Sequence, residues 1–247
     1  MGVKRFCVRT ETVGQRHIFL SPHCDDAIGA CGGLMQGLKN VVVFTVFTKQ
    51  YTLPLSSLAE ELHRDWGIID AVESRKKENK NACEYLGVTW LNLDFLEIIY
   101  RTKDGKPICS KFKEIKNPNH PIDAQLVEEI LCKIESYISQ QDVIYVPMSF
   151  GFHADHVIVH RVGIKLLEKG YKVYFYQDFF YEKPLHVTGF REWKYLFGEA
   201  ELRKKVEACR FYVSQMRSLF RSEAAAEEYI CKTFDGTNAC ELYYEKI

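Results

Sequence analysis

Two short clusters of histidine and aspartate side chains are the residues of this sequence best suited to chemistry. The first is Ser21-Pro22-His23-Cys24-Asp25-Asp26, and the second is His153-Ala154-Asp155-His156. Carboxylates that lie close together and out of water repel each other, so they persist where they are paired, protonated or bound to a cation. Imidazole and carboxylate groups are common ligands of catalytic zinc. We therefore predict that the two clusters together hold one divalent metal ion.

The residues of the two clusters are sufficient for a hydrolytic site. Two histidines and one carboxylate, here His23, Asp26 and His156, would leave one coordination position for water. A metal ion lowers the pKa of such a water and polarises a carbonyl group. The remaining carboxylate, Asp25, is then the predicted general base. His153 is predicted to protonate a leaving amine or to stabilise the oxyanion.

Asp155 is predicted to hold the ring of His153 and to keep that ring cationic. A simpler interpretation exists for the first cluster, in which His23 caps the turn and Asp25 or Asp26 caps the following helix. The second cluster favours the metal site, because two such clusters at one edge of a sheet are poorly explained as independent caps.

The expected secondary structure puts both clusters directly after strands. Apolar runs and helical spacing predict strands at 17–21, 41–48, 88–93, 142–147 and 172–179 and helices at 27–38, 58–85 (broken near Gly67), 122–140, 156–169 and 199–220, with a closing strand or docked tail at Tyr243 and Tyr244. Strands that alternate with helices indicate an α/β domain with a mainly parallel sheet. In such sheets ligands bind at the carboxyl ends of the strands, which is where both clusters fall.

Composition narrows the class of protein further. The 247 residues show no linker or shift in composition, so we expect a single domain over 1–247. Lysine plus arginine equals aspartate plus glutamate, which gives no basic excess for a nucleic-acid partner. The longest apolar run, 41–48, is too short to cross a bilayer, and 1–16 lacks the apolar core of a secretory signal. Nine cysteines without a Cys-x-x-Cys pair indicate free thiols in a cytoplasmic protein.

The two clusters together resemble the motifs of a known family. Ser21-Pro22-His23-x-Asp25-Asp26 with His153-x-Asp155-His156 is similar to the LmbE/PIG-L family of zinc-dependent N-acetylglucosaminyl deacetylases. Weaker similarities extend along most of the chain, at Arg75-x-x-Glu78, Leu86-Gly87-Val88, Leu93-Asp94, Tyr176-Gln177-Asp178 with Tyr181, and Tyr212-x-Ser214-Gln215.

The resemblance implies a Rossmann-like three-layer sandwich, one Zn²⁺ ion per chain, although other divalent metals are possible, and hydrolysis of an N-acetyl group from a sugar. The positions that match the family's metal ligands are His23, Asp26 and His156, and its base matches Asp25. The resemblance also matches the family's arginine, which contacts substrate or departing acetate, to Arg75.

Two of the residues expected to bind substrate have structural alternatives. A surface ion pair with Glu78, three residues along a helix, is the alternative for Arg75. Asp178, expected at a strand end, is a candidate acceptor for a sugar hydroxyl or a structural residue of its loop. The irregular stretch 94–119 is where a substrate-specific lid could lie.

The chain departs from the commonest form of the family at two positions beside the paired aspartates. Cys24 stands where proline is usual, and Ala27 stands where glutamate is common, so the substrate stays open. With no membrane segment in the sequence, we expect a small soluble N-acetylated glycoside, such as an aminoglycoside-type biosynthetic intermediate. The alternatives are a nucleotide- or sugar-binding protein without hydrolytic activity and a metal hydrolase of another bond, such as an ester. The sequence leaves the oligomeric state unknown.

Overall fold

The structure is a computed structural model that describes residues 14–52, 54–184, 187–220 and 222–247. The prediction that 1–16 lacks a secretory signal therefore falls, except for residues 14–16, outside the described residues. None of the described helices combines the length and the apolar character that crossing a membrane requires.

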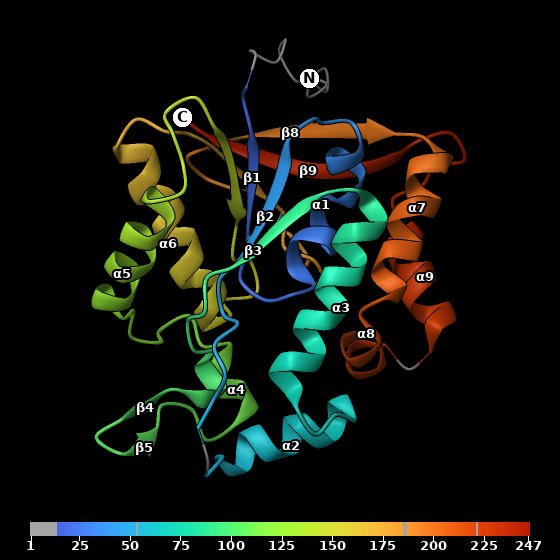
Figure 1. Ribbon diagram of the computed structural model, residues 1–247. Helices are drawn as coiled ribbons and strands as arrows, with labels where there is room; N and C mark the ends of the chain where they lie inside the picture. The colour runs from blue at the N-terminus through green and yellow to red at the C-terminus, as the bar shows by residue number, and fades with distance from the viewer. Residues whose placement is uncertain (1–13, 53, 185–186, 221) are drawn as a thin grey trace.

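A seven-stranded sheet runs through the centre of the molecule (Figure 1). Its strands lie in the order β3-β2-β1-β6-β7-β9-β8. The first five in this order are parallel, whereas β9 is antiparallel to both of its neighbours. The bounds are β1 His17–Ser21, β2 Val41–Thr45, β3 Thr89–Asn92, β6 Val143–Pro147, β7 Lys172–Tyr176, β8 Phe190–Phe197 and β9 Ala239–Lys246. The prediction of an α/β fold with a mainly parallel sheet is confirmed.

The order of the strands reverses between β1 and β6. From β1 the chain moves outward through β2 to β3, and it then returns to place β6 on the other side of β1. The connections that follow β1 and β6 consequently lie on opposite faces of the sheet. The switch point at the carboxyl ends of these two strands, where open α/β sheets have their ligand-binding crevice, is called the crevice below. His23 follows β1 and His153 follows β6, so this crevice is where the two clusters meet.

Helices cover both faces of the sheet, as Figure 1 shows. One face carries α1 Asp26–Gln36, α3 Ala71–Leu86, α7 Glu199–Arg210, α8 Val213–Leu219 and α9 Glu223–Cys231, and the other carries α5 Ala124–Glu135 and α6 Ala154–Glu168. The alternation of side chains along β1 supplies both cores, because Phe19 belongs to the first and Ile18 and Leu20 belong to the second. This three-layer arrangement makes the interior strands apolar on both faces.

The connection from β3 to α5 contains only short elements, as the irregular pattern of 94–119 predicted. They are η1 Ile98–Tyr100, the two-residue strands β4 Thr102–Lys103 and β5 Lys106–Pro107, and α4 Phe112–Ile115. The remaining helix, α2 Ser57–Trp66, ends at Gly67 in a left-handed conformation with φ of 70°, so the predicted break near Gly67 is confirmed.

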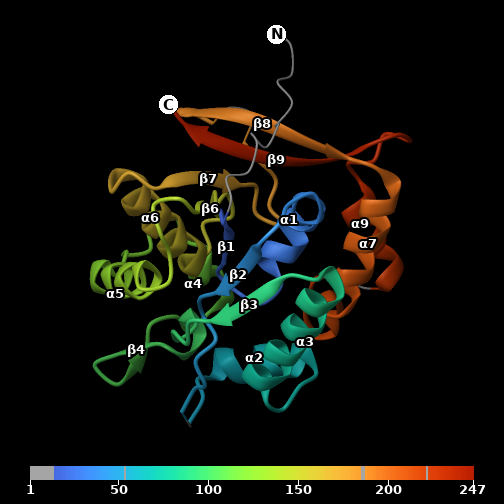
Figure 2. The same ribbon diagram turned by 45° about the horizontal axis from the view of Figure 1, so that its top comes forward.

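The C-terminal part of the chain differs most from the sequence-based expectation. The helix predicted over 199–220 is two helices, α7 and α8, separated at Phe211 and Tyr212. The strand β8 and the helix α9 were not predicted. Figure 2 shows β8 and β9 side by side along one margin of the sheet. Arg191, Glu192 and Lys194 interrupt the apolar pattern of β8, and its pairing with β9 is a non-local contact that the local pattern does not contain.

Candidate functional site

The turn after β1 is built by short-range hydrogen bonds that place His23 and Asp26 side by side. Ser21 Oγ accepts a hydrogen bond from the backbone N–H of Ala27 at 3.0 Å. Asp26 Oδ2 accepts one from the backbone N–H of His23 at 2.7 Å. Asp25 occupies the N-cap position of α1, but its side chain makes no capping hydrogen bond. The interpretation of Asp25 as a helix cap is therefore wrong.

The three predicted metal ligands meet in the crevice. Asp26 Oδ2 lies 3.2 Å from His23 Nδ1 and 3.3 Å from His156 Nε2. One donor atom from each of the three side chains falls within 4.8 Å of the others, and all three residues are buried. This is a set of two imidazoles and one carboxylate of the kind that binds a divalent transition metal.

Each of the two histidines turns its other ring nitrogen toward a buried carboxylate. His23 Nε2 lies 3.1 Å from Asp155 Oδ2, and His156 Nδ1 lies 2.7 Å from Asp178 Oδ1. A carboxylate at one ring nitrogen holds the proton there and leaves the lone pair of the other nitrogen free for a metal. In this arrangement the lone pairs of His23 Nδ1 and His156 Nε2 face Asp26.

The contacts of Asp178 correct its expected role. Its second carboxylate oxygen accepts a hydrogen bond from the backbone N–H of Phe150 at 3.1 Å, and its side chain is completely buried. A sugar hydroxyl would have no access to such a carboxylate. The structure therefore makes Asp178 a residue that orients His156 and does not support its assignment to substrate binding.

The contacts of Asp155 correct a second expectation. Its carboxylate contacts His23, Arg101 and the backbone N–H of Ile98, and only its own backbone N–H, at 3.3 Å, contacts His153 Nδ1. Because that nitrogen accepts a hydrogen bond, the His153 ring is assigned as neutral with its proton on Nε2. Burial, together with the neighbouring His23 and His156, lowers the pKa of His153 well below its usual value. The expectation that Asp155 keeps this ring cationic is wrong.

The charged groups packed around the three donor side chains shift the pKa of each of them. Burial lowers the pKa of His156, but Asp26 and Asp178 outweigh it and raise the value to about 9. Burial likewise opposes the effect of Glu97, Asp155 and Asp26 on His23, yet its pKa is raised well above the usual value. Burial raises the pKa of Asp26, whereas His156 and His23 more than compensate and hold it well below the usual value. The environment thus favours positive charge between these side chains.

The surroundings of Asp25 differ from those of Asp26. Arg75 Nη2 lies 3.6 Å from Asp25 Oδ1, and Arg75 Nη1 donates to Glu97 Oε2 at 2.9 Å. Burial and the neighbouring Asp26 raise the pKa of Asp25 to about 6. The alternative of a surface pair between Arg75 and Glu78 is wrong, because Arg75 is buried and Glu78 accepts hydrogen bonds from Ser214.

The charges around the crevice fit a divalent cation. Two buried guanidinium groups, those of Arg75 and Arg101, face five buried carboxylates. The carboxylates are those of Asp25, Asp26, Glu97, Asp155 and Asp178. The resulting excess of negative charge out of water is unfavourable unless a cation or bound protons offset it. The donor set and this charge balance both fit a zinc ion held by His23, Asp26 and His156.

Sequence reasoning gave no site role to three residues that line or support this site, although Tyr181 belonged to one of the family motifs. Glu97 and Arg101 flank η1 and pair with Arg75 and Asp155. Tyr181 places its ring 5.8 Å from that of His156, measured between centroids. A signal for Glu97 and Arg101 existed, because these two charged residues stand on either side of the apolar residues 98–100 in the irregular stretch 94–119.

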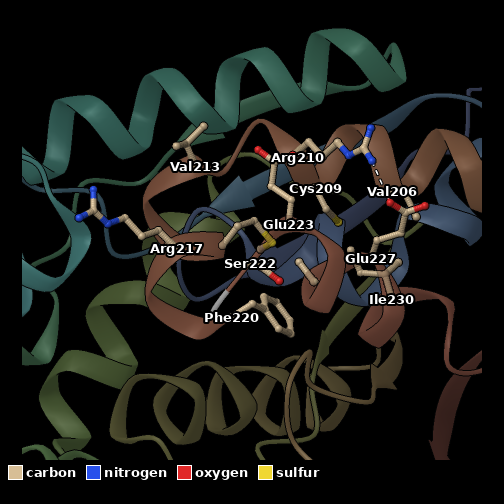
Figure 3. Close-up of a pocket in the computed structure, with 12 residues that line it drawn as sticks. Val206, Cys209, Arg210, Val213, Arg217, Phe220, Ser222, Glu223, Glu227 and Ile230 are labelled. Carbon is tan, nitrogen blue, oxygen red and sulfur yellow. Dashed lines mark hydrogen bonds and ion pairs between the residues drawn. The ribbon is translucent and has the colours of Figure 1, made fainter.

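The two unusual residues beside the aspartates belong to the apolar core. Cys24 and Ala27 are both buried among apolar side chains on the α1 face of the sheet. A separate cavity of about 220 Å³ lies between α7, α8 and α9, and Figure 3 shows its lining, which includes Val206, Val213 and Phe220. None of the predicted ligand or base residues lines this cavity.

The fold and the crevice together define the class of protein: an α/β protein with a His-Asp-His donor set and a spare carboxylate at the switch point of a parallel sheet. Residues 18–167 match the sequence profile of the PIG-L family, described as GlcNAc-PI de-N-acetylase, and the chain belongs to this family. The family resemblance seen in the sequence motifs is therefore confirmed.

Two relatives of established name are both sugar deacetylases. The chain is 28% identical over 235 residues to a 2'-N-acetylparomamine deacetylase of Niallia circulans, with 84% of this chain and 83% of that protein covered. It is 27% identical over 150 residues to a protein of the same name from Streptomyces fradiae, with 59% of this chain and 50% of that protein covered. The prediction that the chain is an N-acetyl sugar deacetylase agrees with both names and with the family.

Solved structures share the fold along nearly the whole chain. A deacetylase from the biosynthesis pathway of teicoplanin superposes with a TM-score of 0.77 at 24% identity, covering 93% of this chain and 97% of that one. A zinc-inhibited form of teicoplanin deacetylase superposes with the same TM-score at 23% identity over the same shares of each chain. At this level of identity the likeness concerns the fold alone.

Proposed function

We propose that this protein hydrolyses the N-acetyl group of a 2-acetamido sugar in a small glycoside, with an aminoglycoside-type biosynthetic intermediate as the substrate. The observation that carries the proposal is the convergence of His23, Asp26 and His156, with Asp25 beside them, in the crevice between β1 and β6. The substrate class rests on the relatives named above, which deacetylate N-acetylparomamine.

The metal in this proposal is one Zn²⁺ ion per chain, held by His23, Asp26 and His156. When bound there, zinc supplies Lewis-acid polarisation of the amide carbonyl and lowers the pKa of water. Asp155 and Asp178 orient the two histidines through their outer ring nitrogens. Zinc suits this donor set of two imidazoles and one carboxylate.

Asp25 carries out both proton transfers in this proposal, and His153 stabilises the oxyanion. Asp25 takes a proton from the attacking water as the water oxygen bonds to the amide carbon. The carbon–nitrogen bond then breaks, and the proton held by Asp25 passes to the departing amine, so that the products are acetate and a free amino sugar. Because the His153 ring is neutral, we assign its Nε2–H to hydrogen bonding with the oxyanion rather than to protonation of the amine.

In this proposal Arg75 holds Asp25 and attracts the departing acetate. Its guanidinium lies against Asp25 on one side and Glu97 on the other, and it stacks 4.8 Å from the centroid of the Trp66 ring. Phe152, which directly precedes His153, is half exposed with φ of 52°. Because Phe152 adjoins His153 in the chain and its ring is exposed, we assign this ring to packing against a sugar ring.

The proposal is tested by incubating the purified, zinc-loaded protein with N-acetylated paromamine, N-acetylglucosamine, diacetylchitobiose and an O-acetylated sugar. We expect release of acetate together with a free primary amine from at least one of the N-acetylated compounds. Acetate release from the O-acetylated sugar alone would replace the amidase by an esterase. No release from any compound, with a metal content near zero that added zinc does not restore, would overturn the proposal in favour of a binding protein.

The identity of the metal is tested separately by elemental analysis of protein purified without chelators. We expect about one zinc per chain. Activity of chelator-treated protein that returns with Mn²⁺ but not with Zn²⁺ or Co²⁺ would assign another ion to the same side chains.

A further inference from the structure

The short segment from Glu97 to Arg101, which contains η1, packs into the interior beside the crevice. Arg101 is buried, and its guanidinium Nη2 forms an ion pair with Asp155 Oδ1. The backbone N–H of Ile98 donates to Asp155 Oδ2 at 3.0 Å. Two groups of one five-residue segment therefore hold the same carboxylate from different directions.

Asp155 transmits this hold to a predicted metal ligand. The oxygen that accepts from Ile98, Oδ2, also lies 3.1 Å from His23 Nε2. The opposite nitrogen of that ring, Nδ1, lies 3.2 Å from Asp26 Oδ2 in the donor set. A continuous chain of contacts thus runs from Arg101 through Asp155 to His23, and the ring orientation of His23 depends on where the Asp155 carboxylate is fixed.

The unfavourable free energy of burying the Asp155 carboxylate explains why this series of contacts depends on Arg101. The Asp155 side chain is completely buried, and a buried carboxylate without a paired cation is strongly unfavourable. The planar fork of a guanidinium also fixes the direction of its partner, which a point charge does not. Arg101 is itself held against the face of the Phe47 ring, 5.4 Å from the centroid, so it has a defined position from which to act.

We infer that Arg101 is a positioning residue for the metal site, which sets the affinity of the site for zinc by fixing Asp155 and, through it, His23. The inference rests on the proposed function, since it takes His23 as a ligand. Arg101 belongs to the irregular stretch 94–119, where a substrate-specific lid could lie. The inference gives this residue a different task, which is to support the metal site from within the fold.

The test measures zinc affinity, not activity. Metal-free wild-type, R101A and R101K proteins are titrated with zinc in competition with a chromophoric chelator, and Lys103→Ala, which alters an exposed cation two residues further on, is the matched control. We expect R101A to weaken zinc binding by about 10- to 100-fold, as losses of such supporting contacts do. R101K should lose less, because it keeps the charge without the fork, and K103A should match wild type.

A double-mutant cycle tests whether Arg101 acts through Asp155. In the Asp155→Asn background, R101A should weaken zinc binding little further, because the partner that transmits its effect is already altered. Full additivity of the two losses would contradict action through Asp155. The visible absorption of the Co²⁺-substituted proteins gives a second readout, and we expect a changed spectrum for R101A and the wild-type spectrum for K103A.

The outcomes separate this inference from the function on which it rests. Zinc binding by R101A within twofold of wild type overturns the inference and leaves the proposed function standing. Failure of the wild-type protein to bind zinc, Co²⁺ or Mn²⁺ overturns the proposed function itself. Circular dichroism of the metal-free proteins checks folding, and if R101A does not fold, R101K and R101Q serve in its place, with wild-type affinity of R101Q counting against the inference.

Discussion

At the scale of single residues, the environment gives two neighbouring aspartates different chemistry. Asp26 lies between His23 and His156, which hold its pKa well below the usual value against the opposing effect of burial. Asp25 faces Arg75, and burial and Asp26 raise its pKa to about 6. A carboxylate surrounded by histidines suits a metal ligand, whereas a buried carboxylate with a raised pKa suits proton transfer near neutral pH.

Replacing Asp25 by asparagine separates these two tasks. We expect Asp25→Asn to keep its zinc, because its carboxylate is outside the three-donor set, and to lose about 100-fold or more in kcat/KM, the usual contribution of a general base. Elemental analysis and steady-state kinetics measure the two effects, with Asp65→Asn on the exposed side of α2 as the control. Loss of zinc from a folded Asp25→Asn protein would show that base and ligand had been confused.

At the scale of the elements, α3 carries a buried polar row that fixes its position against the sheet. Asn79 Nδ2 donates to Thr45 Oγ1 at the end of β2, and Asn79 Oδ1 accepts from Tyr212 at 2.9 Å. Tyr212 stands at the junction of α7 and α8 and is completely buried. Arg75 lies four residues before Asn79, on the same side of the helix, so this row also places the guanidinium beside Asp25.

Removing the Tyr212 hydroxyl tests the importance of this row. We expect Tyr212→Phe to lower the free energy of unfolding by about 1–3 kcal/mol, because Asn79 Oδ1 is left buried without its hydroxyl donor. Urea denaturation measures the change. Tyr85→Phe, at a part-exposed position of the same helix α3, should stay within about 0.5 kcal/mol of wild type. Equal stability of the two variants would mean that the row does not hold α3 in place.

At the scale of the whole molecule, the sheet joins parts of the chain that are far apart in sequence. The neighbouring strands β1 and β6 bring the two clusters together at their carboxyl ends. Near their amino ends, Arg16 and Asp142, 126 residues apart, form an ion pair of 2.6 Å. The donor set at the carboxyl ends and the ion pair at the amino ends both depend on the pairing of β1 with β6. A bound metal and the Arg16–Asp142 ion pair should therefore each affect the stability of the whole folded protein.

Zinc should stabilise the folded protein as a whole. At a free zinc concentration 100 times its dissociation constant, binding adds about 2.7 kcal/mol, which corresponds to a rise of about 5–10 °C in Tm for a chain of this size. Differential scanning calorimetry of metal-free and zinc-loaded protein measures the rise. We expect His156→Ala to abolish it and His120→Ala, outside the donor set, to retain it. An undiminished rise in His156→Ala would place the ion elsewhere.

The Arg16–Asp142 pair should make stability depend on pH. Burial raises the pKa of Asp142, but hydrogen bonds from Arg16 and from the backbone N–H of Ser139 outweigh it and lower the pKa below the usual value. A carboxylate with a depressed pKa in the folded state contributes stability above its unfolded pKa of about 3.9 and loses that contribution as the pH falls through the folded value.

We therefore expect Asp142→Asn to be less stable than wild type by about 1–2 kcal/mol at pH 7, a range reduced because Arg16 is partly exposed to solvent. The difference should persist to about pH 5 and shrink below about pH 4. Urea denaturation across this range measures it, with Asp104→Asn at an exposed turn as the control. A difference that does not change with pH would exclude the charge of Asp142 as its source.

Much of the fold could be predicted because its signals are local. The apolar runs of the five parallel strands and the helical spacing of α1, α3, α5 and α6 are properties of short windows, and the turn after β1 follows directly from one of them. Strand β8 could not be found in this way, because its charged residues hide the pattern and only pairing with β9 makes it a strand.

Residue type and position after strands are enough to predict His23, Asp26 and His156 as the metal ligands. Tertiary structure decided what surrounds them. The fold directs the Asp155 carboxylate toward His23 and not His153, and it buries Asp178 against His156. It also packs Glu97 and Arg101, which come from a stretch without regular pattern, beside the site. The physical reason is that ligand type is a property of one side chain, whereas its hydrogen-bond partners and pKa depend on which distant segments the fold packs against it.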